Sequence, residues 1–229
     1  MTSGSAGTPC GPAVAAHLGH ALTALHPGRR LRVAVDGVDG SGKTVFGSAL
    51  AAQIRSSGRS AVSTTVDRFH RPAARRYARG RHSPIGFYRD SFDDEQLRSV
   101  LLDPFGPGGD GCYRAGVWDV GTDTPDVAPV HPSADDAVLV LDGVFLQRPP
   151  LRDVWDVVVF LHVPFAETYR RMAVRDGCPA DPEHPANVRY RQGQQLYLEE
   201  CSPAAHADVL LDNSDPRGPR LLRWPQRWG

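Results

Sequence analysis

Lysine is nearly absent from this sequence: of its 26 Lys and Arg residues, only Lys43 is a lysine. Such a bias toward arginine indicates a GC-rich coding background. A lysine kept against that background marks a position where arginine fails, because a compact ammonium and a planar guanidinium are not interchangeable around a phosphate. Lys43 is therefore the first candidate functional residue.

Long apolar runs and net charge are also missing. No apolar run approaches the roughly 20 residues that span a bilayer, and the first 30 residues carry no signal-peptide pattern. The formal net charge is zero, so nothing favours nucleic acid or an anionic membrane as a partner. The four cysteines form no CxxC pair, which leaves a zinc ribbon or redox motif without support. We therefore expect a cytoplasmic protein that acts on a small molecule; the sequence leaves open whether it forms a homo-oligomer.

Short apolar runs alternate with helical patterns along the chain. The predicted strands are residues 31–36, 61–66, 137–141, 156–163 and 207–211, and the predicted helices are residues 13–25, 45–54, 95–102 and 164–175. Continuous apolar strands are typical of a parallel sheet covered on both faces. The alternation predicts an α/β fold with a parallel doubly wound sheet and helices on both faces.

We expect one domain over residues 1–229, with four segments that depart from the alternation of strands and helices. They are a loose terminus at 1–11, an insertion on the substrate side at 103–135, a lid at 176–190 and a C-terminal tail at 213–229. The insertion is longer than an ordinary connection, and long loops are usually functional or disordered. The sequence leaves open whether the tail packs on the body.

A glycine-rich turn follows the first predicted strand and opens a helix. Its residues match the P-loop pattern of Gly, four residues, Gly, Lys and then Ser or Thr. Such a loop turns backbone N–H groups toward an anion, and the helix behind it adds its positive N-terminal end. The predicted nucleotide-binding residues are Gly37, Asp39, Gly40, Ser41, Gly42, Lys43 and Thr44.

A P-loop alone does not define the reaction. A regulatory GTPase needs an Asn-Lys-x-Asp motif, which cannot occur because the only lysine is already in the loop. The Leu-Ser-Gly-Gly-Gln signature of transporter ATPases is absent as well. Phosphoryl transfer to a small molecule also needs acids, and Asp67 and Asp142 each follow a predicted strand, at one edge of a parallel sheet.

From residue 31 to 212 the chain resembles the uridine kinase family, which includes phosphoribulokinase and bacterial pantothenate kinase. The motifs that carry the resemblance are the P-loop, Asp67-x-Phe69-His70 where the family has Asp-x-Phe-Tyr, Arg89-Asp90-Ser91-Phe92-Asp93 where it has Pro-Asp-Ala-Phe-Asp, Asp142-Gly143 where it has Glu-Gly, and Arg175-Asp176 at the lid. The order of these motifs along the chain makes the resemblance specific.

The resemblance implies a role for each matched residue. Asp67 would be the general base toward the acceptor hydroxyl, and Thr44 with Asp142 would hold Mg²⁺. Asp90 would bind ribose hydroxyls, although it and Asp93 could instead cap the following helix. Arg175 would close over the phosphates of ATP. The residues expected to contact the acceptor or its new phosphate are Asp67, Phe69, His70, Asp90, Trp118, Asp123, Arg189 and Arg191.

The segment 118–123 departs from the family pattern. Members specific for uridine and cytidine have Tyr-Asp-Phe with a His three residues later, whereas Val120 and Asp123 stand here in place of the Phe and the His. Five arginines between 71 and 81 form a basic patch that is either a solvated surface or a site for an anionic acceptor.

The leading hypothesis is transfer of the γ-phosphoryl group of ATP to a hydroxyl of a nucleoside or nucleoside-like molecule. Two alternatives remain open. One is a kinase for another alcohol, such as a pantothenate-like or sugar-like compound or a nucleoside antibiotic inactivated by phosphorylation. The other is a nucleotide-binding regulator without catalysis.

Overall fold

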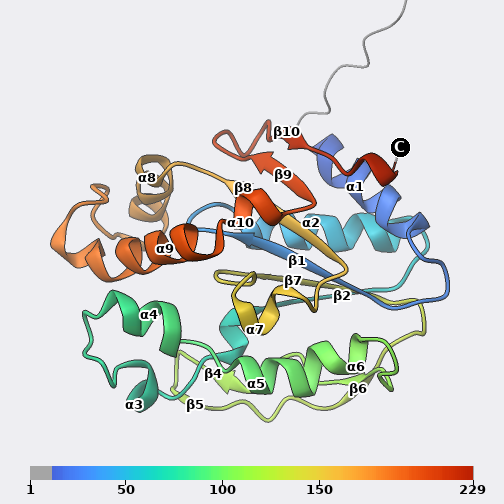
Figure 1. Ribbon diagram of the computed structural model, residues 1–229, viewed down its shortest axis with the longest axis horizontal. Helices are drawn as coiled ribbons and strands as arrows, with labels where there is room; N and C mark the ends of the chain where they lie inside the picture. The colour runs from blue at the N-terminus through green and yellow to red at the C-terminus, as the bar shows by residue number, and fades with distance from the viewer. Residues whose placement is uncertain (1–11, 229) are drawn as a thin grey trace, which may run out of the picture.

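A six-stranded sheet forms the centre of the computed structural model, which describes residues 12–228 (Figure 1). In spatial order its strands are β10 (Arg220–Arg223), β9 (Val209–Asp212), β8 (Val157–His162), β1 (Leu31–Gly37), β7 (Val138–Gly143) and β2 (Ala61–Thr65). Neighbouring strands pair in parallel except β9 and β10. The predicted α/β fold is confirmed, and an antiparallel edge strand absent from the prediction completes it.

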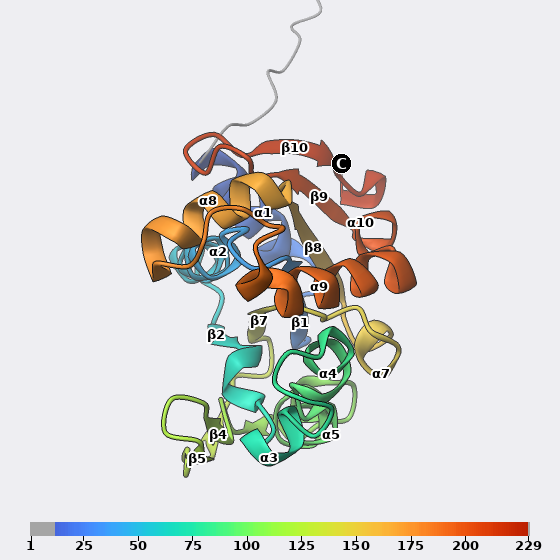
Figure 2. The ribbon, with the colours of Figure 1, turned by 90° about the vertical axis from the view of Figure 1, so that its left-hand side faces the viewer.

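Both faces of the sheet are covered, as the continuous apolar strands predict. Along β7, Val138 and Val140 face one core while Leu139 and Leu141 face the other, because side chains alternate along a strand. The first core is closed by α1 (Pro12–Ala24) and α2 (Lys43–Ser56). The second takes residues from α4 (Pro84–Asp90), α5 (Asp94–Leu97), α6 (Asp103–Phe105), α7 (Pro149–Arg152), α9 (Val188–Cys201) and α10 (Pro203–His206). Figures 1 and 2 show α1 and α2 on the opposite side of the sheet from α4 to α7.

The predicted helix at 95–102 is found as a composite element. It begins at α5, continues through the π-helical turn η2 (Arg98–Leu102) and ends in α6. The rest of the 103–135 insertion contains two short antiparallel ribbons, β3 (Cys112–Tyr113) with β6 (His131–Pro132) and β4 (Trp118–Asp119) with β5 (Thr124–Pro125). In Figure 2 the β4–β5 ribbon lies below the end of β2.

The carboxyl ends of the central strands gather the predicted site residues. β1 leads through residues 37–42 into α2, and β2 leads into the 3₁₀-helix η1 (Val66–Phe69), which contains Asp67. Asp142 of β7 is in register with Val35 of β1 on one side and with Thr65 of β2 on the other. The sheet therefore brings Asp142 between the strand of the P-loop and the strand of Asp67, as expected for a parallel arrangement.

The C-terminal tail packs on the body. β10 extends the sheet, and the rings of His17 in α1 and Trp224 lie 4.6 Å apart. Trp224 in turn contacts Trp228 in η4 (Gln226–Trp228) at 5.3 Å. The predicted loose terminus at 1–11 lies outside the described residues. Within residues 12–228, no helix combines the length and the apolar character needed to cross a bilayer.

Candidate active site

The P-loop connects β1 to α2 through two glycines with left-handed backbone. Gly40 has φ +73° and Gly42, which caps α2, has φ +89°. A Cβ atom on Gly40 would lie 2.7 Å from the carbonyl oxygen of Thr168, so the loop also needs glycine for space. The first turn of α2 contains Lys43 and Thr44 and directs its free N–H groups into the loop, as in anion sites at helix N-termini.

Lys43 lies across the loop with its side chain largely buried. It is 9% exposed, and its Nζ donates a hydrogen bond to the carbonyl oxygen of Val38 at 2.8 Å. An ammonium has three N–H donors, so two remain for phosphate oxygens. The role of Lys43 toward the phosphates stays a prediction, for which these two donors are available.

Thr44 and Asp142 form a pair of oxygen donors at the entrance to α2. The Thr44 Oγ1 donates to Asp142 Oδ2 at 2.7 Å. Burial raises the pKa of Asp142 above its ordinary value, while the Thr44 hydroxyl and the Lys43 ammonium oppose that rise. Within residues 12–228 no cluster of three His, Cys, Asp or Glu side chains could hold a metal. A carboxylate and a hydroxyl fit Mg²⁺, which keeps several waters and shares its coordination with substrate phosphates.

A cavity of about 140 Å³, here called the central cavity, unites most of the predicted catalytic residues. It is lined by P-loop residues together with Asp67, Asp142 and Arg175. Arg175 lies at the end of α8 (Phe165–Asp176) and donates to both carboxylate oxygens of Asp176 at 2.7 Å. Asp67 reaches the cavity from η1, and its carboxylate has no hydrogen-bond partner among the described residues. The reacting groups that the sequence predicts thus lie around one small space.

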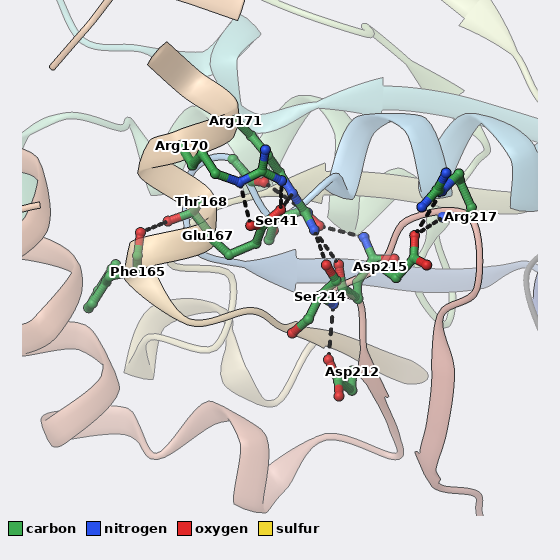
Figure 3. Close-up of polar contacts among 12 residues, drawn as sticks. Ser41, Phe165, Glu167, Thr168, Arg170, Arg171, Asp212, Ser214, Asp215 and Arg217 are labelled. Atoms are coloured by element: carbon green, nitrogen blue, oxygen red, sulfur yellow. Dashed lines mark hydrogen bonds and ion pairs between the residues drawn. The ribbon is translucent and has the colours of Figure 1, made fainter. Parts of the chain in front are cut away.

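A larger groove of about 640 Å³ opens between α2 and α8. This α8 groove is lined mainly by apolar side chains, among them Val45, Phe46 and Met172. Figure 3 shows Arg171 reaching from α8 to the loop after β9, where its Nη2 donates to the carbonyl oxygens of Asn213 and Ser214, both at 2.8 Å. A groove next to a P-loop with apolar walls suits a flat ring.

Two residues of this groove were missed by the sequence reasoning. Arg171 also donates to Glu167 at 2.7 Å and to the P-loop carbonyl of Gly40 at 3.4 Å. Asn213 donates from Nδ2 to the carbonyl oxygen of Ser41 at 2.6 Å. The position of Asn213 directly after the last parallel strand was the available signal, because that edge of the sheet forms the site.

A third cavity, of about 450 Å³, lies beside the β4–β5 ribbon. This ribbon cavity is lined by Asp67, Arg68, Trp118, Asp119 and Asp126, with apolar and hydroxyl side chains between them. Asp67 therefore lies on the walls of both the central cavity and the ribbon cavity. One carboxylate connects the phosphate end of the site with a second space large enough for a small molecule.

The structure is similar to solved structures of kinases with the same core. A candidate uridine kinase from Bacillus stearothermophilus matches at a TM-score of 0.67 and 26% identity, over 86% of this chain and 96% of that protein. A candidate fructose transport system kinase from a Silicibacter species matches at 0.61 and 26% identity, over 92% and 98%. The protein is a P-loop kinase similar to the uridine kinase family. The resemblance that the motifs predict is confirmed.

A more distant relative agrees in fold alone. The structure of phosphoribulokinase from Rhodobacter spheroides matches this protein at a TM-score of 0.54 and 17% identity, over 85% of this chain and 75% of that enzyme. No family model and no curated protein matches the sequence of this protein.

Several predicted acceptor contacts have other partners in the kinase. Asp123 accepts hydrogen bonds from the Ala73 N–H at 3.0 Å and from Arg76 at 2.7 Å, so it fastens the ribbon to α3 (Ala73–Arg76). Asp90 accepts from Arg79 at 2.8 Å. Asp93, by contrast, caps α5 by accepting from the Gln96 N–H at 3.1 Å, as the capping alternative predicts. Neither Asp90 nor Asp123 lines one of the three cavities.

Arg189 and Arg191 also have other partners among the described residues. Arg189 is 7% exposed and donates to the carbonyl oxygen of Arg81 at 2.8 Å, with its guanidinium 5.0 Å from the centre of the Tyr77 ring. Arg191 pairs with Glu183 of the lid at 2.9 Å. Arg189 therefore joins α9 to the segment before α4, and Arg191 holds the lid.

Phe69 and His70, which follow Asp67 in the chain, pack beneath the turn that contains it. Phe69 is fully buried in the second core. His70 Nδ1 lies 2.8 Å from the carbonyl oxygen of Asp67, and its ring is 4.5 Å from that of Phe92. Burial lowers the pKa of His70 below its ordinary value. The His70 imidazole thus stabilises the turn that contains Asp67 through this hydrogen bond.

A buried network under the P-loop was not predicted. Asp36, the last residue before the loop, accepts hydrogen bonds from the Gly37 N–H at 2.8 Å, from Gln147 Nε2 at 2.9 Å and from the Tyr197 hydroxyl. Gln194, one turn before Tyr197 in α9, accepts from the Asp39 N–H of the loop. Burial raises the pKa of Asp36, and these donors oppose the rise. Helix α9 therefore contacts both Asp36, which precedes the P-loop, and Asp39 within the loop.

Replacement of Tyr197 by Phe is expected to lower the free energy of unfolding by about 1–3 kcal/mol at neutral pH, because a buried carboxylate loses a donor. This loss should grow as the pH rises through the pKa that Asp36 has in the folded protein. It should shrink below the ordinary pKa of an aspartate, where the carboxyl group is protonated in both the folded and the unfolded state. Urea unfolding at neutral and acidic pH measures it. Tyr113→Phe, at another buried tyrosine, is the control; equal losses in both variants at both pH values would contradict the assignment.

Proposed function

We propose that the protein transfers the γ-phosphoryl group of ATP to a hydroxyl of a nucleoside or nucleoside-like small molecule. The observation that carries the proposal is the position of Asp67 on the walls of both the central cavity and the ribbon cavity. A carboxylate at that junction can act as a base and accept the proton of a hydroxyl that attacks the phosphorus atom. The α8 groove would take the base of ATP, and the ribbon cavity the acceptor.

Each step has a residue in reach. The acceptor oxygen forms a bond to the γ-phosphorus, the bond from that phosphorus to the bridging oxygen of ADP breaks, and the hydroxyl proton moves to Asp67. Lys43 and the N–H groups of the P-loop stabilise charge on the phosphate oxygens. Thr44 and Asp142 would hold Mg²⁺, which when bound neutralises charge on the phosphates. Arg175, which lines the central cavity and the α8 groove, would hold the phosphates from the lid side.

The experiment that tests this proposal is an acceptor screen with ATP and Mg²⁺, read by ADP formation and by mass of the phosphorylated product. Transfer to a nucleoside hydroxyl supports the proposal. ATP bound but left intact with every acceptor supports the non-catalytic regulator instead. The assignment to the cytoplasm stays a prediction.

A kinase for another alcohol is the second candidate. The altered 118–123 segment favours it, because Asp123 is bonded to Ala73 and Arg76 and Val120 adds no ring to the ribbon cavity. Turnover of a sugar-like or pantothenate-like alcohol together with inactivity on uridine would select this candidate in the same screen.

A further inference from the structure

The ribbon cavity has an unequal balance of charged walls. It is lined by three carboxylates, from Asp67, Asp119 and Asp126, and by one cation, Arg68. The Arg68 guanidinium is already paired, through Nη2, with Asp126. Within residues 12–228, neither Asp67 nor Asp119 forms an ion pair, although the Arg68 charge also acts on Asp119.

The carboxylate of Asp119 is exposed at the turn of the ribbon. Its Oδ1 accepts both backbone hydrogen bonds of the ribbon turn, from Gly121 at 2.8 Å and from Thr122 at 3.3 Å. These bonds lower the pKa of Asp119 below its ordinary value, so the side chain is charged at neutral pH. The Thr122 side chain and the Arg68 charge act in the same direction. The Asp119 side chain is exposed, so its carboxylate can also receive a donor from a ligand.

The arginines of the 71–81 patch do not compensate this charge. None of the five lines the ribbon cavity. Arg76 is bonded to Asp123, and Arg79 to Asp90. Arg81 lies over the Tyr77 ring at 4.7 Å. A phosphate or carboxylate on the acceptor would thus meet two carboxylates and no free guanidinium, which is unfavourable for like charges.

Trp118 adds a second feature suited to a cation. Its Nε1 donates to Asp123 Oδ1 at 3.3 Å, so the polar edge of the indole is fixed by the ribbon. The rest of the half-buried side chain lines the ribbon cavity. An indole face attracts ammonium groups through its quadrupole and also stacks on flat rings.

We infer that the acceptor is a hydroxyl compound that carries a protonated amine, such as an amino sugar or an aminonucleoside, with its ammonium between Asp119 and the Trp118 ring. The inference rests on the proposed function, because it takes the ribbon cavity as the acceptor site. In this arrangement Asp119 selects the acceptor, and Asp67 remains free to take the hydroxyl proton.

Two matched series of compounds test the charge preference. One is D-glucosamine, D-glucose and D-glucuronate; the other is uridine carrying an aminomethyl, hydroxymethyl or carboxyl group on its C5 carbon. Binding is measured by calorimetry with Mg²⁺ and a non-hydrolysable ATP analogue, and turnover is measured separately with ATP. In at least one series the amine is expected to bind about five- to tenfold tighter than the neutral compound, and the anion most weakly.

Variants assign the preference to named residues. Asp119→Asn keeps an oxygen for the turn and is expected to reduce the preference for the amine about threefold. Asp126→Asn releases Arg68 and is expected to raise the affinity for the anionic compound by a similar factor. Asp110→Asn is the matched control, because Asp110 accepts from the Cys112 N–H at 2.8 Å in the same type of turn and does not line the cavity.

The outcomes separate this inference from the proposed function. Equal binding of amine and neutral compounds, a preference for the anion, or no binding by any amine overturns the inference, while phosphorylation of any acceptor keeps the kinase proposal. A clear preference for the amine that falls in Asp119→Asn but not in Asp110→Asn supports the inference even when the bound compound is not phosphorylated. In that case the kinase proposal, and not the charge preference, fails.

Discussion

Replacement of Asp67 by Asn is expected to lower kcat by about 10²- to 10⁴-fold, the usual contribution of a general base. The amide keeps the shape of the side chain but cannot take the proton of the acceptor hydroxyl. Affinity for ATP should hold or rise, because the change removes a negative charge from the wall of the central cavity. Product formation on the acceptor from the screen, together with calorimetric titration of ATP, measures both effects.

Asp135→Asn is a matched control for this variant. Asp135 has a side chain that is 94% exposed and pairs with Arg30 at 2.7 Å, away from the cavities. The Asp135→Asn variant should have an unchanged kcat. Full turnover by the Asp67 variant on the natural acceptor would remove Asp67 from the role of base, and with it the mechanism proposed above.

Replacement of Lys43 by Arg is expected to lower kcat/KM by about 10²- to 10³-fold, although the charge is kept. Lys43 is 9% exposed and its Nζ already lies 2.8 Å from the Val38 carbonyl oxygen, so the wider guanidinium would have to displace the loop or the phosphates. Steady-state kinetics on ATP, with thermal unfolding to verify the fold, measures the loss.

Two further variants isolate the cause of that loss. Lys43→Ala removes the charge as well as the shape, and any additional loss relative to Lys43→Arg reports the charge. Arg55→Lys makes the reverse exchange on the same helix, at a side chain that donates to the Ala61 carbonyl oxygen, and should leave the kinetics unchanged. Unchanged kinetics in Lys43→Arg would mean that the single lysine of the chain reflects codon usage alone.

The sequence predicts the core of the fold and the position of the candidate phosphate-binding residues at one edge of the sheet, for a local reason. The P-loop needs only a strand, a glycine turn and a helix that are contiguous in the chain, and the parallel sheet then brings Asp67 and Asp142 to the same edge. The Thr44–Asp142 contact follows from those two rules.

The acceptor end could not be predicted in the same way. The partners of Asp123 and Arg189 come from the segment 73–81, and the orientation of that segment depends on long-range packing that no local pattern encodes. A motif match indicates that an acid stands at position 123, but whether it faces a ligand or an arginine depends on the neighbouring helix. The same holds for the contacts of Arg171 and Asn213 with the P-loop.

The antiparallel strand β10 affects how two copies of the chain could associate. A free sheet edge offers unpaired N–H and C=O groups to a second chain, and flanking charges discourage that pairing. β10 covers the edge of β9 and begins and ends with an arginine, Arg220 and Arg223. Arg223 further donates to the carbonyl oxygen of Ala207 at 2.8 Å, which ties the strand to its own chain. Growth of a continuous sheet between molecules is therefore disfavoured at this edge.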